Sequence, residues 1–166
     1  MGLRKVLSRK DEMLRKKCRP VTDFGGKISD LMDDLRETMV ASHGAGLAAP
    51  QVGILRRAVV IVRGDEIIEL INPEILERSE DKVGEFEGCL SCPNQRAWIM
   101  RPRVVKVRAQ DRSGKWFELE CEEFAARAAC HELDHLDGVL FTDFADKVFT
   151  ESELDEMLSE QEEDDE

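Results

Sequence analysis

The nine residues CHELDHLDG, at positions 130–138, restrict this chain to folds in which one helix presents two histidines to a single point. His131 and His135 are four positions apart, so on a helix both imidazoles lie on one face and can bind the same metal ion. Glu132 lies between them, where its carboxylate can act as acid or base on a water molecule at that metal. The preceding EEFAARAAC is rich in helix formers. We predict a metal-binding helix over about residues 122–137.

Two histidines leave a catalytic metal site incomplete, because such a site has three protein ligands and one open position. The segment EGCLSCP provides Cys89 and Cys92, which could form a redox dithiol, half of a four-cysteine zinc site, or a single third ligand. A thioredoxin-like dithiol belongs to a βαβ pattern that this sequence lacks. A four-cysteine site needs a second close pair, but Cys121 and Cys130 are nine positions apart. We favour one cysteine of the first pair as the third ligand.

Composition limits the remaining classes of protein. A chain of 166 residues with 42% hydrophobic residues is typical of one globular domain. No apolar run approaches the ~18 residues of a membrane span, so we expect no membrane association. Five cysteines, an odd number, together with an N-terminus that lacks the apolar core of a signal peptide, argue against a disulfide framework. We expect a cytoplasmic protein.

The net charge of −12 is concentrated at the end of the chain. Residues 151–166 contain ten acidic residues and no basic one, whereas the rest has 26 acidic and 24 basic residues. The body is therefore nearly neutral, and no basic surface for nucleic acid is expected. We divide the chain into a catalytic domain at residues 1–149 and an acidic tail at residues 150–166, with a short helix followed by disorder over residues 162–166.

Hydrophobic patterns predict the remaining elements. Apolar residues recur at three- and four-residue spacing after Ser29, a plausible N-cap, which indicates a helix to about Ser42. The small residues at 44–53 predict a tight loop. A polar segment at 75–88 predicts an edge strand. Strands are expected at 58–64 and 66–73, and a hairpin at 104–110 and 116–120. Helices at both ends with strands between them predict an α+β fold.

Three segments in chain order, GAGLAAPQVG, EGCLSCP and CHELDHLDG, closely resemble the motifs GxGLAAxQ, EGCLS and HExDH of the peptide deformylases. The similarity extends over about residues 3–145. Because three ordered motifs match, the resemblance is far more specific than the histidine motif alone. It implies the α+β deformylase fold, with a central metal helix among antiparallel sheets.

The resemblance also implies roles for individual residues. Cys89, His131 and His135 would bind the metal, which is Fe²⁺ in family members that also accept Zn²⁺, Ni²⁺ or Co²⁺. Glu132 would be the general acid and base. An oxyanion would be stabilised by the side-chain amide of Gln51 and the backbone N–H of Leu90, which are donors of the appropriate kind.

Four further residues are implied at the substrate site. Gly46 would allow the substrate backbone to pair with the enzyme, and Arg96 matches a position that approaches the peptide. Ala45 replaces a residue that is often Ile. Arg127 occupies a usually apolar position of the methionine pocket, where we expect its stem to pack while its guanidinium reaches water. Outside the substrate site, Glu87 and Arg101 are a candidate ion pair.

The resemblance predicts hydrolysis of the N-terminal formyl group of formylmethionyl nascent polypeptides. The substrate brings the enzyme near the ribosome, but the acidic tail excludes contact through a basic C-terminal helix. One rival is another hydrolase of the HExxH type, which the cysteine ligand disfavours. The other is a non-catalytic domain whose metal has four protein ligands, and Cys92 or Cys130 would then be the fourth.

Overall fold

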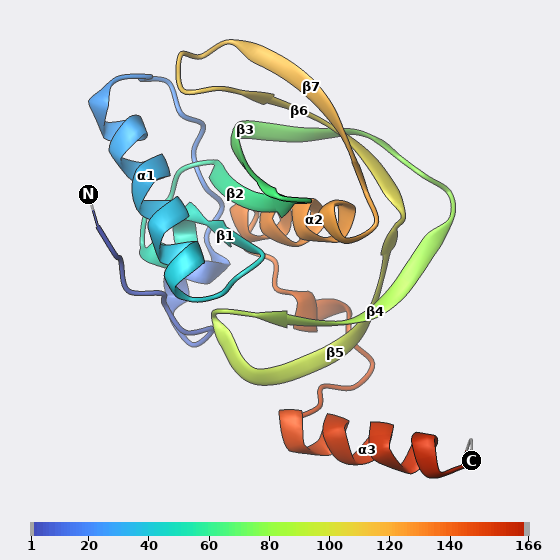
Figure 1. Cartoon of the computed structure of the whole chain (residues 1–166). Coiled ribbons are helices and arrows are strands. Elements are labelled where there is room, and N and C mark those ends of the chain that lie inside the picture. Colours follow the sequence, from blue (N-terminus) through green and yellow to red (C-terminus); the bar gives the residue numbers. More distant parts are fainter. Residues whose placement is uncertain (1, 165–166) are drawn as a thin grey trace.

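The order of helices and strands along the chain is that of an α+β protein, as predicted. The computed structural model describes residues 2–164 (Figure 1). Its elements in chain order are a 3₁₀ turn at Glu12–Arg15, α1 (Gly26–Ala41), β1 (Gly46–Ala48), a 3₁₀ turn at Ala49–Val52, β2 (Ala58–Arg63), β3 (Glu66–Arg78), β4 (Lys82–Cys89), β5 (Cys92–Pro102), β6 (Val104–Gln110), β7 (Trp116–Glu122), α2 (Phe124–Leu136), a 3₁₀ turn at Phe141–Phe144 and α3 (Glu151–Asp164).

The strands form two antiparallel sheets. One sheet has five strands in the order β1-β2-β3-β6-β7, and the other is the hairpin β4-β5. The predicted hairpin of β6 and β7 is present, and its turn closes through Asp111, whose carboxylate accepts hydrogen bonds from the backbone of Ser113 and Lys115. β2 and β3 are joined at Gly64, where the backbone has the left-handed φ of 61° that glycine adopts without strain.

The segment predicted as one edge strand at 75–88 divides between two strands, so that prediction is wrong. Residues 75–78 continue β3, and β4 begins only at Lys82. A bulge between Ile71 and Glu74 accommodates Pro73, which has no N–H for the ladder. Asn72 stabilises the bulge because its side chain hydrogen-bonds the backbone of Val21.

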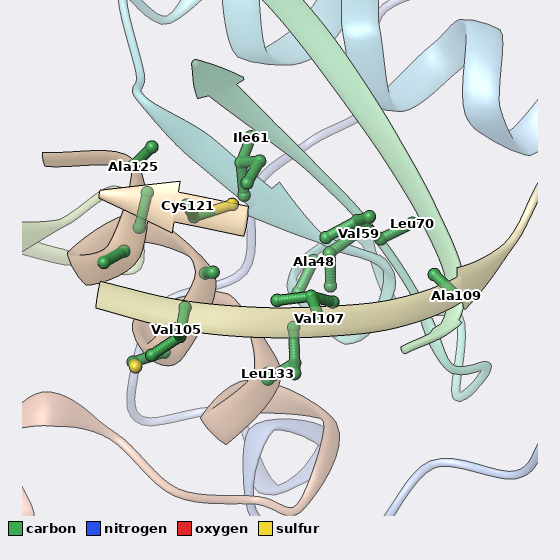
Figure 2. Close-up of a cluster of buried hydrophobic side chains, with 14 of the residues drawn as sticks. Ala48, Val59, Ile61, Leu70, Val105, Val107, Ala109, Cys121, Ala125 and Leu133 are labelled. Atoms are coloured by element: carbon green, nitrogen blue, oxygen red, sulfur yellow. The ribbon is translucent and has the colours of Figure 1, made fainter. Parts of the chain in front are cut away.

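The helix α2 lies at the centre of the molecule, among strands of both sheets (Figure 1). Figure 2 shows Leu133 of α2 in the same buried cluster as side chains of β2 and β6. Alternate residues of β2 pack against two different helices. Val59 and Ile61 pack with α2, whereas Ala58 and Val60 pack with α1. This double burial explains the continuous apolar run of β2.

The structure differs from the predicted elements in three details. α1 begins at Gly26 with Gly25 as its N-cap, so Ser29 lies inside the first turn and donates its N–H to the Gly25 carbonyl. The small-residue segment 44–53 contains strand β1 and a 3₁₀ turn where a loop was predicted. α3 continues through Asp164, although the composition predicts disorder from residue 162, and residues 165–166 lie outside the described range. Within residues 2–164, no helix is long and apolar enough to cross a membrane.

Candidate metal centre

Three side chains from two elements converge on one point beside α2. Cys89 ends β4, and His131 and His135 lie one helical turn apart on α2. Their ligand atoms all lie within 4.8 Å of one another, and the Cys89 Sγ is 3.4 Å from the His135 Nε2. One thiolate and two imidazoles suit a divalent transition metal such as iron or zinc.

The residues around these ligands fit a bound metal. His131 donates its Nδ1–H to the Glu87 Oε1 at 2.8 Å, which leaves the Nε2 free to bind an ion. Burial lowers the pKa of His135 well below its ordinary value, so this imidazole stays neutral, as a metal ligand must be. Among the described residues, the buried Oε1 of Glu132 and Nδ1 of His135 have no hydrogen-bond partner.

Neither of the other candidate cysteines joins the ligand group that the described residues form. Cys92 is fully buried, and it packs in a small apolar cluster that includes Ile99 and Phe141. Cys130 packs in the main core cluster. Three protein ligands with an open position are typical of a catalytic site, whereas a structural site has four.

Glu87 is the centre of a buried ion network behind the histidines. Its two oxygens accept hydrogen bonds from the Arg101 Nε at 2.8 Å and Nη2 at 3.0 Å, and from the Arg127 Nη1 at 2.6 Å. The predicted Glu87–Arg101 pair is therefore confirmed. Burial alone would raise the pKa of Glu87, but hydrogen bonds and charges from Arg101 and His131 lower it to about 2. Glu87 thus remains an ionised acceptor for the ring of His131.

The guanidinium of Arg127 does not reach water, so that part of the prediction is wrong. Besides Glu87, it donates to the carbonyl oxygens of Ile99 at 2.9 Å and Val83 at 2.6 Å. Only 7% of the residue is exposed. The side chain is directed inward because three acceptors lie within reach of its guanidinium, and hydrogen bonds from an ionised donor are stronger than neutral ones.

Glu132 is enclosed next to the three ligands. Burial raises the pKa of its carboxyl group to about 7, a value suited to taking up and returning protons near neutral pH. Strand β1 passes directly over it, since a Cβ at Gly46 would lie 2.5 Å from the Glu132 Oε2. Glycine is therefore the residue that this crossing allows.

Gln51 and Leu90 also lie at this point. The Gln51 Oε1 accepts the Ala48 N–H at 2.9 Å, and its Nε2 lies 3.0 Å from the Ser91 Oγ and 3.5 Å from the Cys89 Sγ. The amide is thus held with its NH₂ group toward the ligands. Leu90 follows Cys89 directly in the chain, and Gln51 and Leu90 both line a cavity beside the ligands.

A cavity of about 410 Å³ opens onto Cys89 and His131 of the ligand group. All four residues predicted for substrate binding line it: Ala45, Gly46, Arg96 and Arg127. Sequence reasoning missed other lining residues, including Phe86, Asn94, Phe124 and Glu151. None of them lies in a motif that indicates a site, and Glu151 belongs to the acidic tail. His43, which follows α1, lines this cavity too.

An HExxH helix among antiparallel strands, with a cysteine as the third possible ligand and an open cavity, defines a metal-dependent hydrolase. The sequence profile of the polypeptide deformylases matches residues 3–150. A peptide deformylase of Caldicellulosiruptor bescii is 50% identical over 159 residues, which cover 96% of this chain and 95% of that protein. The chain belongs to the polypeptide deformylase family.

Solved structures agree with this assignment. The crystal structure of the Thermotoga maritima peptide deformylase is 40% identical, with a TM-score of 0.85, and the match covers 87% of this chain and 99% of the other. A peptide deformylase of Acinetobacter baumannii with Met-Ala-Ser bound has a TM-score of 0.81 at 32% identity, and that match covers 86% of this chain and 98% of the other.

Proposed function

We propose that this protein hydrolyses the N-terminal formyl group of formylmethionyl nascent polypeptides and releases formate and a free methionine amine. The observation that supports this most strongly is the position of Glu132, which is buried beside Cys89, His131 and His135 and lies under the edge strand β1. The relative with Met-Ala-Ser bound, a peptide that begins with methionine, supports a peptide substrate.

We infer that Cys89, His131 and His135 hold the metal, with Fe²⁺ as the resident ion and Zn²⁺, Ni²⁺ or Co²⁺ as substitutes. The thiolate and imidazole donors suit these ions. When bound, the ion supplies Lewis acidity and lowers the pKa of a water molecule. Glu87 keeps the ring of His131 oriented through the 2.8 Å hydrogen bond to its Nδ1.

Protein groups would then move the proton and stabilise charge. Glu132 would take the proton of the attacking water and return it to the leaving amine, and its raised pKa of about 7 supports both transfers. The carbonyl oxygen becomes negative during attack. The Gln51 amide and the Leu90 backbone N–H would stabilise that charge, because they are hydrogen-bond donors fixed before the reaction.

The peptide backbone would extend along β1. This strand is at the edge of its sheet and pairs only with β2 among the described strands, so its other side can accept an added strand. Gly46 has no side chain, so the substrate backbone could approach this strand closely. Ala45 and Arg127 would contact the methionine side chain. Arg96 would approach the residues that follow. The nascent-chain substrate and five free cysteines support a cytoplasmic location close to the ribosome.

The test measures formate release from formyl-Met-Ala-Ser, with the chain purified anaerobically and its metal quantified. Glu132→Gln should keep the metal and lose about 10²–10⁴-fold in kcat, because it removes proton transfer and no ligand. Glu77→Gln, an identical change at an exposed position of β3, is the matched control and should keep wild-type turnover. Metal loss in Glu132→Gln would show that Glu132 is a ligand, and absence of formate from the metal-loaded wild type would reject the proposal.

A further inference from the structure

The start of α3 is attached to the wall of the active-site cavity. Arg96 of β5 and Phe149 exchange two backbone hydrogen bonds of 2.8 Å, which form an antiparallel bridge just before the helix. The Glu151 N–H donates to the Asn94 Oδ1 at 2.9 Å. These hydrogen bonds hold the start of the acidic tail against β5, next to the proposed catalytic residues.

An ion pair within the cavity wall results from this attachment. The Arg96 Nη2 donates to the Glu151 Oε1 at 2.9 Å, and both residues line the cavity. The guanidinium also lies against β4, since a Cβ at Gly88 would be 2.6 Å from the Arg96 Nη1. Arg96 is therefore held between β4 and α3, and its charge is matched by that of Glu151.

The positive charge of Arg96 at this side of the cavity is therefore compensated by Glu151. Residues 152–164 of α3 add seven acidic residues and no basic one, but Glu151 is the residue of this helix that lines the cavity. The side chain of Glu151 is 55% exposed, so one side of its carboxylate faces solvent at the cavity. A cationic side chain on a bound peptide would meet a free acceptor here, whereas an anionic one would be repelled.

We propose that Glu151 is a specificity-determining residue that favours formylmethionyl peptides with a basic residue shortly after the methionine. The inference rests on the proposed deformylase function, and it adds a preference that depends on charge. Because both partners are partly exposed, the preference is modest, about two- to five-fold, as is typical of exposed ion pairs. Salt weakens it, because the Debye length falls to about 3 Å at 1 M ionic strength.

The experiment compares kcat/KM for two C-terminally amidated peptides, formyl-Met-Ala-Lys and formyl-Met-Ala-Glu. The ratio of the two values should exceed one for the wild type and fall about two- to five-fold in Glu151→Gln. Glu151→Lys should shift the ratio further in the same direction. Glu160→Gln removes the same charge from the same helix at a position that does not line the cavity, and it should keep the wild-type ratio.

Each result decides the inference. An equal fall of kcat/KM for both peptides in Glu151→Gln would show a structural role only, and an equal change of the ratio in Glu160→Gln would show a general effect of tail charge. Either outcome overturns the inference. Calorimetric binding of the amidated products Met-Ala-Lys and Met-Ala-Glu measures the same preference without turnover. It therefore separates failure of this inference from failure of the proposed function, which appears as absence of formate from both peptides.

Discussion

Replacing Arg127 with methionine should destabilise the protein and weaken metal binding, although the residue lies outside the ligand set. Methionine has a similar length and fills the space of the arginine stem. It removes the hydrogen bond to the Glu87 Oε2 at 2.6 Å and those to the carbonyls of Ile99 and Val83. Glu87 keeps both bonds from Arg101, so its charge remains compensated.

The expected loss of stability follows from these contacts. Removing one partner of a buried ion pair costs about 3–5 kcal/mol when the other charge is left alone. In Arg127→Met this cost is smaller, because Arg101 still compensates the charge of Glu87. Each backbone carbonyl that loses its hydrogen-bond donor adds a further cost of about 1–3 kcal/mol unless another donor replaces it. We expect the free energy of unfolding to fall by about 3 kcal/mol. For a chain of this length, that is a fall of roughly 6–12 °C in melting temperature.

The assay is thermal and denaturant unfolding of metal-free protein, followed by metal titration. Affinity should fall by about 10- to 100-fold if the ring of His131 loses its fixed orientation. Arg103→Met is the matched control, because Arg103 pairs with Asp81 and Glu123 on the surface, and it should change the melting temperature far less. An Arg127→Met protein as stable as the wild type would show that the guanidinium is solvated, and the buried network would then be refuted.

Two further predictions concern the ligands and the pH dependence of stability. Cys89→Ala should lose the metal and Cys92→Ser should keep it; metal analysis checks both, and a metal-free Cys92→Ser protein would contradict the ligand assignment. Burial would raise the pKa of Glu69, but hydrogen bonds and charges from Arg112 and Arg36 lower it below its ordinary value of 4.5. The ionised Glu69 therefore contributes to the free energy of unfolding above pH 4.5, and this contribution is lost as pH falls through the folded-state pKa. Denaturation at several pH values should therefore show that acid lowers the free energy of unfolding less in Glu69→Gln than in the wild type. An identical fall in the two proteins would contradict this prediction.

Short-range patterns sufficed for the metal helix and most strands. The spacing of His131 and His135 fixes both rings on one helical face, and the alternation along β6 and β7 fixes a hairpin. The beginning of α1 was misplaced because Ser29 is a good N-cap in isolation, whereas the chain uses Gly25. Tertiary contacts outweigh such local preferences.

The features that sequence could not provide depend on residues far apart in the chain. Spacing alone left Cys89 and Cys92 equivalent, and only the family motif separated them. The direction of the Arg127 side chain depends on Glu87, 40 positions away, and on carbonyls of the hairpin β4-β5. The position of Glu151 depends on the backbone bridge between Arg96 and Phe149, for which no local pattern exists.

The origin of the ligands from two separate elements has a consequence for the fold itself. Cys89 and His131 are 42 positions apart, so an ion bound by both closes a long loop that contains β5, β6 and β7. In the chain-entropy description of disulfides, closing a loop of that length restricts the unfolded chain by about 4 kcal/mol. A bound ion would act as a cross-link between the hairpin β4-β5 and α2. After chelation, amide hydrogen exchange should accelerate first in β4 and β5, while the amides of β6, held between β3 and β7, exchange later.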